Sequence, residues 1–177
     1  MIELWFTTSR LPLSAIIRAA TKSKSSHMAV CNKRDGLVYH FFFDGLRIET
    51  VQDFLGHATL VRAVTLPLEF KQRNVFVTMF NKHIDACKYG YDYGAFVWWA
   101  WQALLTCVTG RSVPGRNEGG QRYAFLCTEL LYMVNAAFVE AAGWHLIPQG
   151  VALDTVSPDS VADIINREVT QHASKAS

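Results

Sequence analysis

Three short runs rich in β-branched and aromatic residues, between His27 and Val51, constrain the fold of this chain more than any other feature. The runs are HMAVC, LVYHFFF and LRIETV, and turn residues at Asn32–Gly36 and Asp44–Gly45 separate them. Short strands joined by tight turns pair with their neighbours along the chain in antiparallel order. We therefore expect an antiparallel β meander in this part of the chain.

The segments around the meander have strand and helix patterns of their own. Alternation predicts strands, and apolar spacing or cap residues predict helices. The strands are Ile2–Thr7 and Ala58–Pro67, and the helices are Ser14–Ala20, with Ser14 as a candidate cap, Thr50–Leu55 and Glu69–Tyr89. The uncharged run Tyr93–Gly110 is rich in Trp and is interpreted as a buried helix rather than a membrane span. Strands grouped together and followed by helices are typical of an α+β fold.

Length and composition favour one domain. A chain of 177 residues that is 50% hydrophobic can bury a sizeable core. We expect a single domain over residues 1–169 and a polar, frayed tail over 170–177. Ser157, Pro158 and Asp159 have the order of a cap and first turn, so we expect them only to start the last helix.

The net charge, the N-terminal segment and the cysteines indicate which binding partners and which cellular location to expect. A net charge of +2 is too small to predict nucleic-acid binding. Glu3, Arg10 and Pro12 interrupt the first apolar run, so we expect no signal peptide and, by default, a cytoplasmic location. Four widely scattered cysteines with no CxxC pair favour reduced thiols, and we expect no metal and no cofactor.

Cys127 lies where a loop is predicted to become a helix. The segment Arg122–Gly143 has apolar residues at helical spacing from Glu129 onward, and Gly143 is a stop signal. The free N–H groups and the macrodipole of a helix N-terminus stabilise a thiolate and lower the pKa of a thiol. Cys127 is therefore a candidate nucleophile; the alternative is a small buried hydrophobic residue.

Two histidines lie on neighbouring strands of the expected meander. His27 opens the first strand and His40 lies in the second. Counting outward from the turn at Asn32–Gly36 brings the two residues close together, so a hydrogen bond between the imidazoles is expected. Such a bond would fix the tautomer of a catalytic base. The alternative is that each is a structural histidine with its own hydrogen bonds.

Five segments in this order resemble the circularly permuted NlpC/P60 group of papain-like thiol hydrolases, which includes the YiiX/YaeF-like proteins and is related to the lecithin:retinol acyltransferases. They are SRLPLSAIIRAATKSKSSHMAV, VYHFFFDGLRIETVQDFL, YDYG, FLCTELL and SPDSVADII, and they extend from about Thr7 to Ile165. The resemblance implies a permuted papain-like fold, with an antiparallel β meander or barrel packed against helices, in which the His-bearing strand precedes the Cys-bearing helix. It places the nucleophile at Cys127, the base at His27 and the orienting group at His40, where many YiiX-like members have Glu.

The resemblance also implies a reaction and a source. The reaction is cleavage of an amide through a thioester on Cys127, and the first choice of substrate is a peptidoglycan-like peptide. The alternatives are a lipid amide or ester hydrolase or an acyltransferase on the same triad, or a non-catalytic structural or virion protein that kept the fold. Short members of this type are often encoded by bacteria and their phages. A phage protein would be virion-associated or released on lysis.

Substrate contacts are expected in the middle of the chain. Tyr93 belongs to the YDYG segment and is a candidate for lining the cleft. The segment Thr109–Gln121 has four glycines and one proline and leads toward Cys127. Its Arg111 and Arg116 would present positive charge to a substrate that carries carboxylates.

Overall fold

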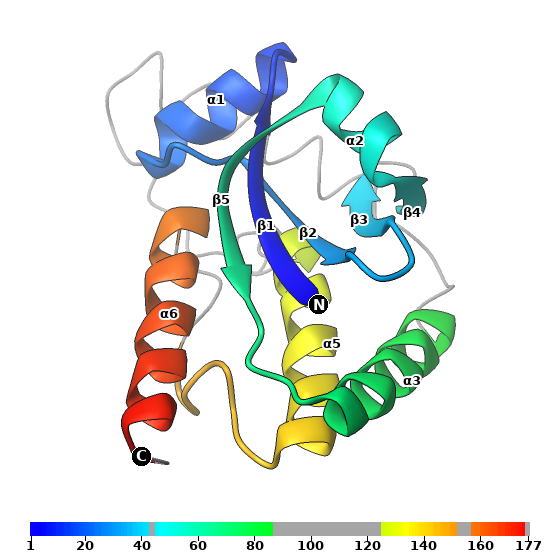
Figure 1. The fold of residues 1–177 in the computed structure, drawn as a ribbon. Helices are drawn as coiled ribbons and strands as arrows, with labels where there is room; N and C mark the ends of the chain where they lie inside the picture. The colour runs from blue at the N-terminus through cyan, green and yellow to red at the C-terminus, as the bar shows by residue number, and fades with distance from the viewer. Residues whose placement is uncertain (43–44, 87–124, 152–156, 176–177) are drawn as a thin grey trace.

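The computed structural model describes residues 1–42, 45–86, 125–151 and 157–175 (Figure 1). Along the chain, strands come first and longer helices follow, as the sequence predicted. The elements are β1 (Ile2–Ser9), α1 (Pro12–Thr21), β2 (His27–Asn32), β3 (Leu37–Phe42), β4 (Gly45–Thr50), α2 (Val51–His57), β5 (Ala58–Thr65), α3 (Phe70–Ala86), α5 (Phe125–Ala142) and α6 (Pro158–Lys175).

The described strands form one open sheet of five strands in the order β4-β3-β2-β1-β5, and every neighbouring pair is antiparallel. The prediction of an antiparallel meander is confirmed, because β2, β3 and β4 are consecutive in the chain and adjacent in the sheet. The α+β class is confirmed as well. The turn between β2 and β3 contains Gly36 at φ 67°, a left-handed conformation that glycine adopts without strain.

Each face of the sheet packs against different helices. Because side chains alternate along a strand, Phe6 and Val30 lie on one face, where they join a core cluster with Val134 and Phe138 of α5. On the other face, Trp5 of β1 belongs to a smaller buried cluster with Phe54 of α2. In Figure 1, α5 passes behind the sheet, and α2 lies near the end of the sheet that also carries α1.

The boundaries of α1 and α6 differ from the predicted ones. Helix α1 begins at Pro12, two residues before the predicted cap Ser14, because proline's fixed φ suits a first helical turn. Ser14 is buried and its hydroxyl bonds instead to Ser26. Helix α6 continues to Lys175, so residues 170–175 are helical and do not form a frayed tail. The stacking of His172 on Trp144, with ring centroids 3.8 Å apart, holds this last part of the helix.

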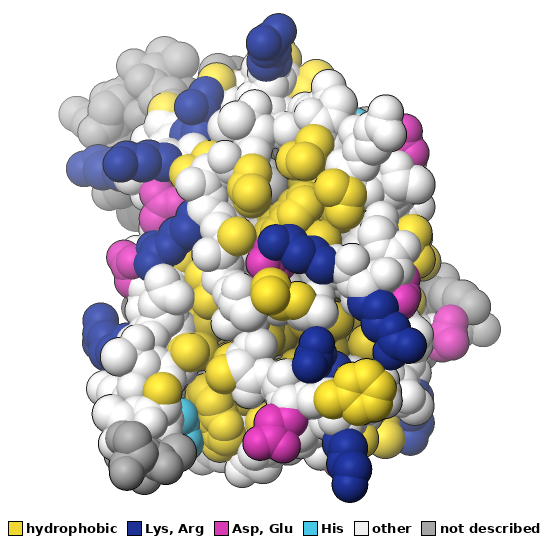
Figure 2. Space-filling model, viewed as in Figure 1, with side chains coloured by type: hydrophobic (Ala, Val, Ile, Leu, Met, Phe, Trp, Pro, Cys, Tyr) yellow, Lys and Arg dark blue, Asp and Glu magenta, His cyan; other side chains and the backbone are white. Residues whose placement is uncertain are grey.

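The surface carries mixed charges. Figure 2 shows Lys and Arg side chains dispersed over one face, with apolar side chains exposed above β1, β5 and α2. Leu55, Leu60 and Val61 are among the exposed large apolar residues. None of the helices in the described parts of the chain is both long and apolar enough to span a membrane.

Candidate active site

The imidazoles of His27 and His40 are in contact, as the sequence predicted. His40 pairs with Ala29 in the β2–β3 register, so His27 lies diagonally across from it on the same face of the sheet. Nε2 of His27 is 3.2 Å from Nδ1 of His40. The two rings are almost perpendicular, at 88°, with centroids 5.3 Å apart.

Glu49 and His57 extend this pair to a chain of four titratable side chains. Glu49 pairs with Val38 on β3, which places its side chain diagonally across from His40. Its Oε1 is 3.5 Å from Nε2 of His40, and its Oε2 is 2.7 Å from Nε2 of His57. At 3.5 Å the first contact is electrostatic rather than a full hydrogen bond, and Nε2 of His40 has no other partner among the described residues.

Burial fixes His40 in this position. Its side chain is only 1% exposed, and the edge of its ring meets Phe54 of α2 with centroids 4.9 Å apart. Helix α2 follows β4 directly and is capped by Thr50, whose hydroxyl accepts a hydrogen bond from the N–H of Asp53. The same short helix therefore supplies both the apolar wall behind His40 and, at its last residue, His57.

The charge of Glu49 favours one pair of tautomers. A carboxylate only accepts, so neutral His40 keeps its proton on Nε2, toward Glu49. Nδ1 of His40 then accepts from Nε2–H of His27, and Nδ1 of His27 keeps a free lone pair. This nitrogen has no hydrogen-bond partner among the residues that the structure describes. It is therefore the atom that can take a proton from an incoming group.

The charges of these groups favour neutral imidazoles. Burial lowers the pKa of His27, and positive charge on His40 or His57 would lower it further. Burial also lowers the pKa of His40, although Glu49 acts in the opposite direction. Burial alone would raise the pKa of Glu49, but the hydrogen bond to His57 and the charges of both histidines bring it below its usual value. At neutral pH, Glu49 is ionised and His27 is a neutral base.

Cys127 is the third residue of α5, within its first turn, which confirms the predicted position at a helix start. Its side chain lies outside the described residues. The described part of α5 packs on the face opposite the one that carries His27 and His40. The N-terminal end of α5 points toward the end of the sheet at which β2 begins (Figure 1).

The chain was compared with models of protein families, with curated proteins and with solved structures. No match was found in any of the three.

Sequence reasoning missed Glu49 and His57. Alternation along β4 was the available signal for Glu49, because it places this residue on the same face as Arg47, but only the register makes His40 its neighbour. His57 had no sequence signal, because it ends a short helix whose direction is set by packing. Tyr93, Arg111 and Arg116, the predicted substrate contacts, lie outside the described residues.

The described residues offer no alternative centre close to the histidine pair. No group of three or more His, Cys, Asp or Glu side chains among them could hold a metal ion. A hollow of about 400 Å³ is lined by Ile2, Asn32, Arg34 and Arg73 among others. It lies at the end of β2 opposite His27, about 16 Å along a strand of this length, so it is separate from the histidine pair.

Proposed function

We propose that the protein is a cysteine hydrolase of the permuted papain-like type, with Cys127 as nucleophile, His27 as general base and His40 as the orienting group. The observation that carries this proposal is the His27–His40 hydrogen bond, which uses Nε2 of His27 and leaves its Nδ1 without a partner among the described residues. A cysteine nucleophile needs a positioned base and a third group that orients the base.

The proposed reaction is acyl transfer through a thioester. Nδ1 of His27 takes the proton of the Cys127 thiol as sulfur attacks an amide carbonyl. The tetrahedral intermediate collapses, the C–N bond breaks, and the same nitrogen gives its proton to the leaving amine. Water, deprotonated by His27, then hydrolyses the thioester to a carboxylic acid and regenerates the thiol. The N–H groups at the start of α5 can stabilise the oxyanion.

The electrostatics support a base that acts during the attack. The described groups favour neutral His27, so an imidazolium does not preexist unless a thiolate stands beside it. His40 would stabilise the imidazolium only through its own contact with Glu49, which is ionised. Glu49 thus has the orienting role that a carboxylate has in the triads of other hydrolases, but it acts from one residue further away.

We propose an amide of a peptidoglycan-like peptide as the substrate. This choice rests on the family resemblance, and the neutral base supports only the wider class of acyl transfer from an amide or ester. A panel of muropeptides, acyl amides and acyl esters would separate the three substrate classes by kcat/KM. Hydrolysis of acyl esters alone would replace the peptide proposal by a lipid one.

Thiol labelling tests the proposal without a known substrate. Iodoacetamide should modify Cys127 fastest of the four cysteines, and His27→Ala should slow that reaction at pH 7. Cys31 is an internal control, because it is fully buried and burial raises the pKa of its thiol to about 11. Equal labelling of Cys127 in the wild type and in His27→Ala would show that the two residues do not work together.

A further inference from the structure

A turn of buried hydroxyl residues leads directly into His27. The turn comprises residues 22–26, between the end of α1 and the start of β2. Its Ser23, Ser25 and Ser26 are buried, and Ser25 is fully inaccessible to solvent. Lys22 is left-handed, with φ 52°, an uncommon conformation for a residue other than glycine. A segment with this many buried polar groups requires specific hydrogen bonds to hold it.

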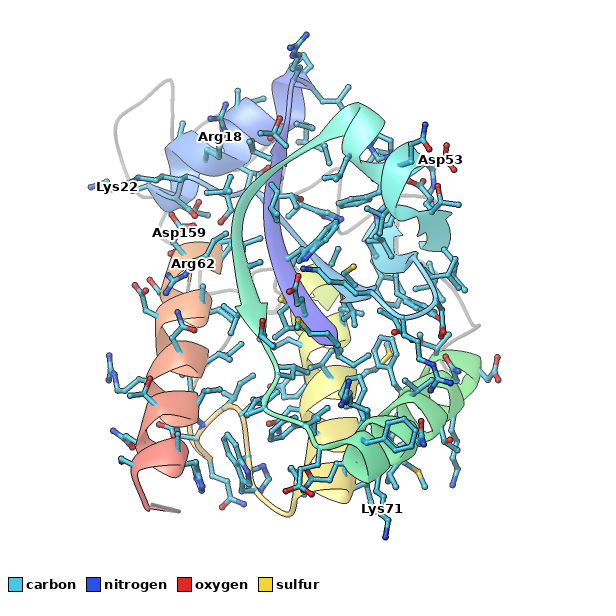
Figure 3. The ribbon with its side chains drawn as sticks, in the orientation of Figure 1. Arg18, Lys22, Asp53, Arg62, Lys71 and Asp159 are labelled. Carbon is cyan, nitrogen blue, oxygen red and sulfur yellow. The ribbon has the colours of Figure 1, made fainter. Side chains whose placement is uncertain are left out.

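The carboxylate of Asp159 supplies these bonds from the far end of the chain. One of its oxygens accepts a hydrogen bond from the backbone N–H of Lys24, at 2.6 Å, and the other accepts from the hydroxyl of Ser25. Figure 3 shows Asp159 at the start of α6, beside the turn that follows α1. Because of these bonds, the pKa of Asp159 is lowered even though burial alone would raise it, so the carboxylate is ionised at neutral pH.

Asp159 is not needed to cap its own helix. Ser157 accepts the hydrogen bond from the N–H of Ser160 and so caps α6. The carboxylate of Asp159 is therefore free to reach across to the turn, which is 134 residues away from it in sequence. This contact gives Asp159 a role beyond the structural one that its Ser-Pro-Asp sequence predicted.

The other end of the turn is fixed to the sheet. The N–H of Ser26 bonds to the carbonyl of Thr7 at 2.9 Å, and the hydroxyl of Ser26 is 2.6 Å from that of Ser14. His27 follows at once and pairs with Thr7. The position of the His27 backbone is thus set by the strand pairing on one side and by the turn on the other.

We infer that Asp159 is a positioning residue for His27: by holding residues 24 and 25, it fixes where β2 begins and keeps the imidazole of His27 in contact with His40. The inference rests on the proposed function for its consequence in catalysis. The geometric part of the inference is independent of the proposed function, since the contact between the imidazoles can be observed in the absence of turnover.

The test compares Asp159→Ala with Asp163→Ala. Asp163 lies one turn further along α6 and pairs with Arg62, so its loss removes a carboxylate from the same helix without touching the turn. Nitrogen-15 NMR of the imidazoles reports the tautomer and the titration of His27. In Asp159→Ala, we expect His27 to lose its single tautomer and to titrate closer to pH 6.5, whereas Asp163→Ala should match the wild type.

Kinetics provide the second readout. A displaced base should reduce kcat by about tenfold to a hundredfold with little change in KM, because misplacement of a reacting group by about 1 Å is sufficient for a loss of that size. Asp159→Asn keeps one acceptor oxygen and should restore part of the activity. If Asp159→Ala does not fold, Ser25→Ala removes one of the two donors and should produce the same changes to a smaller extent.

The outcomes separate this inference from the proposed function. An unchanged His27 spectrum in a folded Asp159→Ala or Ser25→Ala variant would overturn the positioning role, whatever the activity. A changed spectrum together with undiminished hydrolysis in Cys127→Ala would preserve the positioning role and overturn the proposed function.

Discussion

Acid should destabilise the protein through His27. The pKa of this residue is lowered from 6.5 to about 3 in the folded state, with burial as the main cause, whereas in the unfolded chain it should be near 6.5. Below pH 6.5 the unfolded chain therefore binds a proton that the folded chain does not bind. The contribution of His27 to stability is complete above pH 6.5 and is lost progressively as the pH falls toward 3.

The size of the effect follows from the two pKa values. At pH 5.5, protonation of His27 in the unfolded chain, with a pKa of 6.5, lowers the free energy of unfolding by about 1.4 kcal/mol relative to neutral pH. This value holds for any folded-state pKa below about 4.5. The lowered pKa of His40 adds to the loss in the same direction. Native proteins have free energies of unfolding of about 5–15 kcal/mol, so a change of this size is readily measured.

Urea unfolding at pH 7.5 and pH 5.5 measures the loss, with fluorescence of the buried Trp5 among the probes. His27→Gln cannot bind the proton, so the difference in unfolding free energy between the two pH values should shrink by about 1.4 kcal/mol. The control His83→Gln, on α3, leaves the histidine pair intact and should retain the wild-type difference. If the wild type and His27→Gln lose the same free energy, the argument from burial is refuted.

Three further predictions concern the groups around His27. Cys127→Ala should abolish hydrolysis and His27→Ala should be nearly as damaging, whereas His40→Ala should reduce kcat about tenfold to a thousandfold; full activity in Cys127→Ala would contradict the assignment. Glu49→Gln removes the charge that faces Nε2 of His40, so NMR should show a mixture of His40 tautomers, and an unchanged tautomer would rule out this role for Glu49. The hydroxyl of Thr7 is buried and has no hydrogen-bond partner in the described parts of the chain, so Thr7→Val should raise the free energy of unfolding by about 1 kcal/mol in urea titrations; a decrease would mean that the hydroxyl is bonded in solution.

The sequence predicted the parts of the fold that depend on neighbours along the chain. Turn residues at Asn32–Gly36 fixed the pairing of β2 with β3, and alternation placed His27 and His40 on one face, so their contact could be expected in advance. Apolar spacing placed Cys127 at the start of α5. The boundaries of α1 and α6 were less accurate, because Ser14 and His172 are held by tertiary contacts rather than by local preference.

Only the tertiary structure decided what surrounds the histidine pair. The contact of Glu49 with His40 depends on the register of β4, and the contact of His57 with Glu49 depends on how α2 folds back onto the sheet. The bonds of Asp159 join segments 134 residues apart. Periodicity and cap signals extend over a few residues, so the sequence by itself determined the strands, the helix starts and the facing histidines. Packing and register act between distant segments, and for that physical reason they alone selected the groups that surround the histidine pair.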